Sequence, residues 1–291
     1  MEEFILTKAF KATRAKAPLV HSITNYVTVN DCANALLAIG ASPIMSDEPA
    51  DVADITGICD ALTINIGTLN EQSIQAMLVA GARAGELGHP IVLDPVGAGA
   101  SLLRRETASE LLDTLPISVI RCNMSEAKAL CGISERTRGV DVCPDDVVTR
   151  ENLPESLRFA RGLAARNGAV VAITGPIDIV AGAERAFAVY NGSPLQGKIT
   201  GSGCMLSCIC AAYVAAAACD PSTASAPFGL LDALLASVVH MGLAGEIAQR
   251  RMRPEDGNGA YRSYLLDALY CMDAAALEAW AKVEEFTSGG H

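Results

Sequence analysis

Short apolar runs alternate with longer amphipathic runs along the first two-thirds of the chain, and this alternation limits the fold more than any other feature. Apolar runs of strand length between amphipathic runs of helix length predict βαβ units and a parallel sheet. The apolar runs have few polar interruptions, as expected of strands that helices cover on both faces. The pattern therefore predicts a three-layer αβα fold with a mostly parallel central sheet. The predicted strands are 18–24, 41–45, 61–67, 90–97, 117–123 and 169–175, and the predicted helices are 30–40, 48–58, 70–88, 105–115, 124–132 and 155–168.

The remaining third of the chain follows a different pattern. Two apolar runs at 177–182 and 186–192 flank the segment AER, which predicts an antiparallel hairpin at one edge of the sheet. A polar, proline-containing loop at 135–154 is either a domain linker or an insertion over a binding face. Because strands of the same type continue after this loop, we interpret residues 1–291 as a single domain. The helices predicted after the hairpin are 204–219, 228–251, 261–272 and 273–286.

The composition excludes several classes of protein. Apolar residues make up 51% of the 291 residues and charged residues 19%, which is enough apolar material for a large core and is not typical of a disordered chain. The net charge of −11 repels nucleic acid and anionic lipid, so neither is an expected partner. The longest apolar run, 205–219, is shorter than the roughly 20 residues of a membrane-spanning helix. We expect it to be a buried core helix.

Ten cysteines occur without any C-x-x-C pair, in a chain too long to depend on disulfide bonds for its stability. The N-terminal residues do not have the pattern of a secretory signal peptide. We therefore expect free, mostly buried thiols and a cytoplasmic location.

Polar residues gather at the carboxyl ends of the predicted strands. Ligands of open parallel sheets bind outside these ends, so the residues there are the first candidates for a functional site. They are Asn25, Met45, Gly67, Asp94, Asn123 with Glu126, and Thr174 with Gly175.

Asp94 directly follows three apolar strand residues, and Pro95 ends the strand. A carboxylate at this position suits a magnesium ion or electrostatic work beside phosphates. The alternative is a turn aspartate that accepts hydrogen bonds from its own backbone. The spacing favours neither interpretation.

The segment RCNMSE holds three further candidates, Arg121, Asn123 and Glu126. Asn123 and Glu126 have the spacing of a capping box, which is a purely structural arrangement. The alternative is that Glu126 faces the strand-end cleft and helps to order a metal ion and water. Arg121 is either half of a surface ion pair or a phosphate contact, for which its planar guanidinium is well suited. The hydroxyl of Thr174 either contacts a phosphate or only ends its strand.

The segment TGSGCMLS at 200–207 joins a glycine-rich turn to the start of a long apolar helix. Gly201 and Gly203 allow backbone conformations closed to other residues, and the free amides at a helix start attract anions. Gly201, Ser202 and Gly203 are therefore the candidate anion hole. The alternative is an ordinary loop-to-helix turn, because neither the G-x-x-x-x-G-K-[ST] nor the complete G-x-G-x-x-G pattern is present.

Cys204 follows this turn and has three interpretations: a buried structural thiol, a nucleophile, or a weak general base above the anion site. A nucleophile normally needs a histidine partner, and His21 is the one candidate among the four histidines. A cysteine hydrolase is therefore disfavoured. Cys208 and Cys210 lie on the same predicted helix, and their spacing suits buried packing better than a zinc site.

Seven segments in combination resemble hydroxyethylthiazole kinases, a family of the ribokinase-like superfamily. The segments are LVHSITNYVTVNDCANALLAIGASPIMSDEPADVAD, ALTINIGTL, PIVLDPVGAGAS, IRCNMSEAKAL, RGVD, VVAITGPIDIV and TGSGCMLS. The resemblance implies a ribokinase-like fold without a separate lid. It also implies phosphorylation of the primary alcohol of 4-methyl-5-(2-hydroxyethyl)thiazole in the thiamine pathway, with ATP as co-substrate and Mg²⁺ as cofactor. A homotrimer with its sites between neighbouring subunits is a further implication.

The resemblance also implies roles, residue by residue. Cys204 stands where most of the superfamily carries an aspartate base, so it would orient the alcohol and accept its proton. Met45, Gly201 and Asn25 would bind the thiazole. Arg121, Thr174 and Asn123 would bind ATP, while Asp94 and Glu126 would be the acids associated with magnesium.

Two classes of alternative stay open at this point. Another ribokinase-like enzyme, such as a hydroxymethylpyrimidine kinase or an NAD(P)H-hydrate dehydratase, would have the same fold, but the dehydratase typically keeps the aspartate at the position of Cys204. A non-catalytic nucleotide-binding protein would not need the acids Asp94 and Glu126.

Overall fold

The structure is a computed structural model that describes residues 4–133, 143, 146–217 and 228–287. The strands of this part form one nine-stranded sheet in the order β2-β1-β3-β4-β5-β6-β7-β8-β9. β1 to β6 pair in parallel, and β7 to β9 continue the sheet in antiparallel pairings. The strands are β1 Leu19–Ile23, β2 Ser42–Ile44, β3 Ala61–Asn65, β4 Ile91–Asp94, β5 Val119–Asn123, β6 Val170–Thr174, β7 Asp178–Ala181, β8 Arg185–Val189 and β9 Val283–Thr287.

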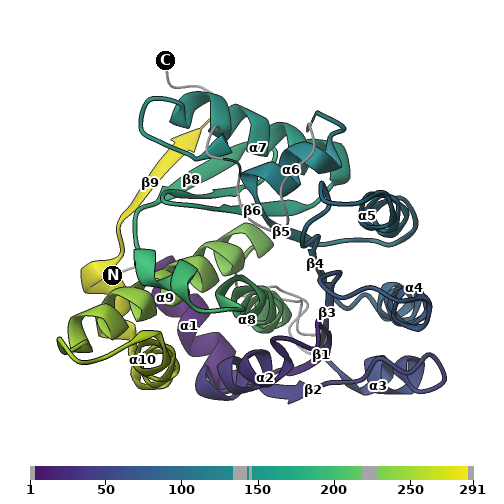
Figure 1. Cartoon of the computed structure of the whole chain (residues 1–291), viewed down its shortest axis with the longest axis horizontal. Coiled ribbons are helices and arrows are strands. Elements are labelled where there is room, and N and C mark those ends of the chain that lie inside the picture. The colour runs from purple at the N-terminus through teal and green to yellow at the C-terminus, as the bar shows by residue number, and fades with distance from the viewer. Residues whose placement is uncertain (1–3, 134–142, 144–145, 218–227, 288–291) are drawn as a thin grey trace.

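Helices cover both faces of the sheet, as the continuous apolar strands predict (Figure 1). One face carries α3 to α7, and the other carries α8 and α9 with α1, α2 and α10 outside them. The predicted three-layer αβα arrangement is therefore confirmed. The helices are α1 Ile5–Lys16, α2 Val29–Ala38, α3 Val52–Ile58, α4 Glu71–Leu87, α5 Leu102–Thr114, α6 Met124–Leu130, α7 Leu153–Asn167, α8 Ser202–Ala217, α9 Leu230–Arg251, α10 Asn258–Cys271 and α11 Ala274–Trp280, with a short 3₁₀ helix at Pro194–Lys198.

The helix ends follow local chemistry. α4 begins after Asn70, whose side chain accepts a hydrogen bond from the backbone N–H of Ser73 at 2.9 Å. It ends at Gly88, which adopts a positive φ of 70° that glycine reaches without strain. Such signals lie in the sequence itself, which is why the boundaries of this helix agree with the predicted range 70–88.

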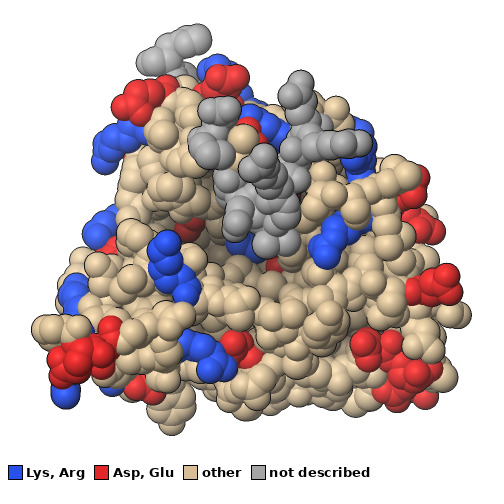
Figure 2. Space-filling view, viewed as in Figure 1, with Lys and Arg blue, Asp and Glu red and all other residues tan. Residues whose placement is uncertain are grey.

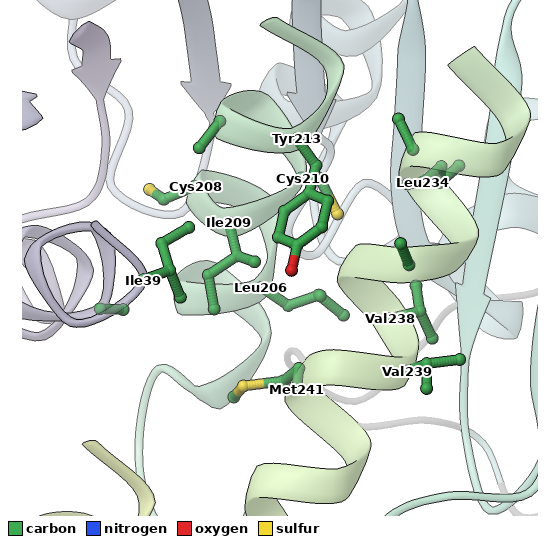
Figure 3. Close-up of a cluster of buried hydrophobic side chains, with 14 of the residues drawn as sticks. Ile39, Leu206, Cys208, Ile209, Cys210, Tyr213, Leu234, Val238, Val239 and Met241 are labelled. Carbon is green, nitrogen blue, oxygen red and sulfur yellow. The ribbon is translucent and has the colours of Figure 1, made fainter. Parts of the chain in front are cut away.

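α8 is the central helix of the core. Every residue from Cys204 to Ala217 is buried, because the sheet covers one side of the helix and α9 the other. Figure 3 shows Leu206, Ile209 and Tyr213 of α8 packed beside side chains of α9. The prediction of a buried core helix at 205–219 is confirmed for the described residues up to Ala217.

α9 is long and apolar enough to span a membrane by length and composition, the one such helix in the described part of the chain. Within the fold, 72% of its most apolar segment is buried. Its composition is therefore accounted for by packing in the core.

One prediction about secondary structure was wrong, and one helix was not predicted. Residues 273–286 were expected to form one helix, but α11 ends at Trp280 and Val283–Thr287 forms β9. β9 pairs with β8, so the β7–β8 hairpin is one strand away from the edge of the sheet. α1 was not expected at all. Half of the loop 135–154 lies outside the described residues. The strands before and after it join the same sheet, and the single-domain interpretation stays a prediction.

Candidate active site

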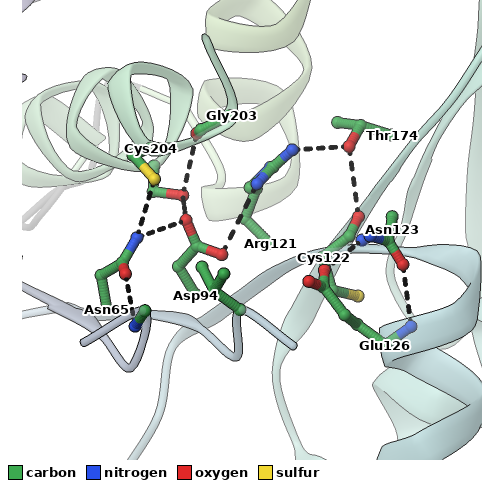
Figure 4. Close-up of polar contacts among 12 residues, drawn as sticks. Asn65, Asp94, Arg121, Cys122, Asn123, Glu126, Thr174, Gly203 and Cys204 are labelled. Carbon is green, nitrogen blue, oxygen red and sulfur yellow. Dashed lines mark hydrogen bonds and ion pairs between the residues drawn. The ribbon is translucent and has the colours of Figure 1, made fainter. Parts of the chain in front are cut away.

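The register of the sheet brings the candidate residues together at the carboxyl ends of the parallel strands. Asn65 and Asp94 are direct partners at the ends of β3 and β4. Asn123 and Thr174 are direct partners at the ends of β5 and β6. The N-terminus of α8 lies against the same ends (Figure 4), so polar strand ends and free helix amides face one another.

Two cavities open at this end of the sheet. The larger has a volume of about 550 Å³ and is lined by Arg121, Asn123, Thr174, Ser202 and Gly203, together with residues of β7, the 3₁₀ helix and α9. The face drawn in Figure 2 is hollowed near its centre, while most charged side chains lie around the periphery.

The smaller cavity has a volume of about 160 Å³ and lies at the ends of β1, β2 and β3. Met45 and Asn65 line it, and so do the exposed side chains Tyr26 and Val29. Met45, a predicted thiazole-site residue, thus lies in a cavity separate from that of the predicted ATP-site residues.

The Arg121 side chain lies below the helix start and is only 11% exposed, so the alternative of a surface ion pair is wrong. Its Nη2 donates to Thr174 Oγ1 at 2.7 Å, and its Nη1 lies 3.5 Å from Asp94 Oδ1. Burial works against the charged guanidinium, but Asp94 and then Glu126 outweigh it and hold the pKa of Arg121 above its ordinary value. A fixed positive charge therefore lies at the base of the larger cavity.

Asp94 is fully buried, and its carboxylate contacts other elements instead of its own turn. Oδ2 accepts hydrogen bonds from Asn65 Nδ2 at 2.9 Å and from Ser207 Oγ at 2.7 Å. Oδ1 has no hydrogen-bond partner and is left with the ion pair to Arg121. The turn-aspartate alternative is therefore wrong, because the carboxylate joins β3, β5 and α8.

Asn123 and Glu126 form the capping box that their spacing predicts. Asn123 Oδ1 accepts from the backbone N–H of Glu126 at 2.8 Å, and Glu126 Oε2 accepts from that of Asn123 at 2.9 Å. The other carboxylate oxygen of Glu126 accepts from the backbone N–H of Gly97 at 2.8 Å. Burial, and then Asp94, raise the pKa of Glu126 to about 7. The capping interpretation does not exclude a functional one, since the buried acid lies near Asp94 and Arg121.

The glycines of the predicted anion hole are required by close packing. Gly201 has a φ of 83°, and a Cβ atom built on it would lie 2.5 Å from Thr28 Cγ2. A Cβ atom on Gly203 would lie 2.5 Å from Arg121 Nη1. Ser202 and Gly203 line the larger cavity, whereas Gly201 lines neither cavity and fixes the turn against Thr28.

Cys204 lies in the first turn of α8, and its Sγ accepts hydrogen bonds from Asn25 Nδ2 and Asn65 Nδ2, both at 3.2 Å. Burial, and then Asp94, raise the pKa of the Cys204 thiol to about 11. His21 does not contact Cys204: its ring nitrogens lie 2.8 Å from Thr56 Oγ1 and 2.9 Å from the carbonyl of Ser46. The nucleophile interpretation thus lacks its histidine.

The other two thiols of α8 are packed in the core. Cys208 Sγ lies 3.7 Å from Ser22 Oγ, and Cys210 Sγ lies 3.2 Å from Ser237 Oγ. Among the described residues, no group of three or more histidine, cysteine or acidic side chains is arranged to hold a metal ion.

A magnesium ion would need oxygen ligands, which the chain offers near the larger cavity. Asp94 Oδ1 is a buried carboxylate oxygen without a hydrogen-bond partner, and Glu126 supplies a second acid close by. Magnesium in nucleotide sites is typically held by one or two carboxylates together with substrate phosphates and water. The residues present therefore fit a magnesium ion that a nucleotide brings with it.

Several residues of the site were missed in the sequence. Asn65 contacts both Asp94 and Cys204, and Ser207 joins α8 to Asp94. Asp178 lines the larger cavity, where burial raises its pKa to about 7. The signal for Asn65 is its place at the end of β3, where the strand-end rule predicts Gly67 instead. The contacts of Ser207 and Asp178 depend on tertiary packing.

Comparisons with known proteins agree on one family. The model of the hydroxyethylthiazole kinase family matches residues 10–275. The chain is 48% identical over 282 residues to a hydroxyethylthiazole kinase of Clostridium acetobutylicum, with 97% of this chain and 100% of that protein covered. The structure is similar to that of a hydroxyethylthiazole kinase protein from Pyrococcus horikoshii OT3, with a TM-score of 0.82, 35% identity and coverage of 97% and 98%. A ribokinase-like superfamily protein of Enterococcus faecalis V583, 16% identical with a TM-score of 0.54 and coverage of 91% and 82%, shares the fold.

Proposed function

We propose a path for the phosphoryl group from the premise that the chain belongs to the hydroxyethylthiazole kinase family. It phosphorylates the hydroxyl group of 4-methyl-5-(2-hydroxyethyl)thiazole with ATP in the thiamine pathway. In this proposal the phosphoryl group passes from the larger cavity to the smaller one at Cys204. The pyrimidine kinase, the dehydratase and the non-catalytic binding protein are thereby set aside as alternatives. The observation that carries the proposal is the position of the α8 N-terminus. Ser202 and Gly203 line the larger cavity, while Asn65, a hydrogen-bond partner of Cys204, lines the smaller one.

ATP occupies the larger cavity in this proposal. Its volume of about 550 Å³ is within the range of ligand pockets, and its base combines the Arg121 guanidinium with the amides of the α8 N-terminus. Arg121, held by Thr174 and Asp94, neutralises charge on the phosphoryl oxygens during transfer. Asn123 contributes to the wall of the same cavity.

Magnesium belongs to the proposal as a cofactor. Asp94 and Glu126 would hold it near the phosphates, where it would supply further neutralisation of negative charge. The chain's own part is to keep these acids in place: Ser207 and Asn65 hold Asp94, and backbone N–H groups hold Glu126.

The alcohol occupies the smaller cavity, where Met45 offers an apolar wall to the thiazole ring. Asn25 and Gly201 shape this side of the site: Asn25 bonds to Cys204, and Gly201 packs on Thr28. Cys204 orients the hydroxyl and accepts its proton as the oxygen attacks the γ-phosphorus. Because phosphoryl transfer has a loose transition state in which positioning dominates, a weak base at this point is sufficient.

The homotrimer implied by the resemblance is part of the proposal as well. Tyr26 and Val27, beside the smaller cavity, are 78% and 57% exposed, so apolar surface lies where a neighbouring subunit would complete the site. We also propose a cytoplasmic location, because every cysteine in the described ranges is a free thiol and free thiols are typical of a reducing compartment.

One assay tests the function. ADP release from ATP and Mg²⁺ is measured with and without 4-methyl-5-(2-hydroxyethyl)thiazole, and the phosphorylated alcohol is identified by mass spectrometry. We expect ADP release to require the thiazole and to equal the phosphorylated product. ADP release that is independent of the thiazole would overturn the substrate assignment.

A further inference from the structure

Two side-chain amides converge on the sulfur of Cys204. Asn25 Nδ2 and Asn65 Nδ2 each lie 3.2 Å from Sγ (Figure 4 shows the bond from Asn65). A neutral thiol is a weak hydrogen-bond acceptor, whereas a thiolate is a strong one. Two N–H groups directed at one buried sulfur therefore suit a sulfur that carries negative charge.

The orientation of the Asn65 amide is set by its other partners. Its Oδ1 accepts from the backbone N–H of Gly67 at 2.9 Å, which can only donate. Its Nδ2 lies 2.9 Å from Asp94 Oδ2, which also accepts a hydrogen bond from Ser207. If the amide were reversed, its oxygen would face the carboxylate of Asp94 and its N–H groups would face the backbone N–H of Gly67. Nδ2 must therefore face Asp94 and Cys204.

The Asn25 amide is held in the same way. Thr28 Oγ1 donates to Asn25 Oδ1 at 3.0 Å, and Asn25 Nδ2 donates to Asn65 Oδ1 at 3.1 Å as well as to Cys204. Both asparagines are buried. The two amides therefore act as one unit around the sulfur.

The backbone behind this unit is fixed by Gly67 and Arg104. A Cβ atom on Gly67 would lie 2.9 Å from Asn65 Oδ1 and 3.0 Å from Asn25 Cβ, so only glycine leaves room for the pair. Arg104 donates to the carbonyls of Ile66, Val96 and Gly67 at 3.1, 2.6 and 2.7 Å. It thereby ties the chain after β3 to the chain after β4.

The charged surroundings of the sulfur explain why such a unit is needed. Asp94 on β4 and the thiol of Cys32 on α2 both disfavour a negative sulfur, and so does burial. The Thr28 hydroxyl and then Arg121 on β5 favour it, but less strongly than burial and Asp94 oppose it. No histidine among the described residues contacts the sulfur, so none stabilises its negative charge.

We propose that Asn25 and Asn65 are positioning residues for the kinase reaction, which together stabilise the thiolate form of the Cys204 sulfur, the form that accepts the proton of the substrate alcohol. This inference rests on the proposed role of Cys204 as the base. In the step, the alcohol oxygen forms a bond to the γ-phosphorus, the bond from that phosphorus to the β,γ-bridging oxygen breaks, and ADP leaves with the electron pair. The alcohol proton passes to the thiolate, and the resulting thiol later releases it to water.

The test combines kinetics with a direct measurement on the sulfur. Turnover of the thiazole alcohol is measured from pH 6 to 9.5 for the wild type, Asn65→Ala, Cys204→Ala and the double variant. In parallel, the pH dependence of Cys204 alkylation by iodoacetamide is followed in the intact protein, with mass spectrometry of its peptide. Asn34→Ala, a partly exposed asparagine of α2 whose side chain donates to Asn30, is the matched control.

We expect Asn65→Ala to lower kcat about tenfold and to move the alkylation midpoint about one pH unit higher, because one hydrogen bond to a charged sulfur is lost. In the Cys204→Ala background the same substitution should change kcat less than about twofold. Asn25→Ala should show the same shift of the alkylation midpoint. If Asn65→Ala does not fold, the midpoint of Asn25→Ala tests the inference in its place.

Equal losses of kcat in both backgrounds, or an unchanged alkylation midpoint in the asparagine variants, would overturn the inference. A wild type without thiazole-dependent turnover would instead contradict the proposed function. Those two failures are distinguishable, because alkylation needs no substrate.

Discussion

Arg121 occupies the space beneath Gly203: a Cβ atom on Gly203 would lie 2.5 Å from Nη1 and 2.6 Å from Nη2 of that guanidinium. The contact joins the start of α8 to the end of β5. It stacks two sources of positive potential, the helix N-terminus and a buried arginine, on one side of the larger cavity. Such an arrangement is favourable when an anion lies between them and the solvent.

Gly203→Ala tests this contact. The added methyl group displaces the guanidinium from Thr174 and Asp94, so we expect kcat/KM for ATP to fall about 10- to 100-fold. Steady-state kinetics at varied ATP measure the loss. Gly162→Ala, on the exposed side of α7 with open space around its Cβ, should leave kinetics unchanged. Wild-type kinetics in Gly203→Ala would show that the position of Arg121 does not matter.

Asp94→Asn tests the proposed magnesium acid. Removal of Mg²⁺ with EDTA should abolish turnover in the wild type, and added Mg²⁺ should restore it. In Asp94→Asn we expect a loss of about 100-fold in kcat that saturating Mg²⁺ does not restore, because the charge facing Arg121 and the metal is gone. Asp113→Asn, an exposed acid of α5, is the control. Full recovery of Asp94→Asn at high Mg²⁺ would argue against the role.

His240 makes stability dependent on pH. Its Nδ1 lies 2.8 Å from Tyr213 Oη in the core, and burial lowers its pKa to about 3. The folded protein keeps the ring neutral, whereas the unfolded chain binds a proton below about pH 6.5. The free energy of unfolding should therefore fall as the pH drops below 6.5, with a contribution from His240 that approaches about 1.4 kcal/mol per pH unit. Urea unfolding at pH 7.5, 6.5 and 5.5 should give a shallower slope for His240→Gln, and equal slopes would contradict this.

Tyr26→Glu tests the trimer. A charge beside the smaller cavity should prevent a neighbouring subunit from packing there, so the variant should be monomeric by light scattering and should have a raised KM for the thiazole. Tyr270→Glu, which changes an exposed tyrosine of α10, should stay trimeric. A monomeric wild type, or a trimeric Tyr26→Glu with an ordinary KM, would contradict the proposal.

The parallel part of the sheet could be predicted because its signals are local. The strands from β1 to β6 are apolar runs bounded by helix caps and glycines. The residues of each strand therefore predict that strand without reference to its neighbours. β9 has no such pattern, since its residues stay partly or fully exposed and its strand conformation depends on pairing with β8, about a hundred positions earlier in the chain. The residues of α1 also depend on distant packing, against α8, α9 and α11.

The candidate site could be predicted to the extent that it lies at strand ends. This rule found Asn25, Asp94 and Thr174, which the structure brings to one edge of the sheet. It missed Asn65 because the apolar run ALTINIG extends past the last paired residue of β3. The packing of Arg121 under Gly203 could not be predicted, because it depends on how α8 docks on the sheet.

The central claim is that Cys204 accepts the proton of the thiazole alcohol between the two cavities. The most direct measurement is single-turnover phosphorylation of that alcohol by the wild type, Cys204→Ala and Cys204→Asp, each saturated with ATP and Mg²⁺. We predict a rate about 10- to 100-fold lower for Cys204→Ala, and a rate near that of the wild type for Cys204→Asp, whose carboxylate accepts the same two asparagine N–H groups. A Cys204→Ala rate equal to that of the wild type would contradict the account.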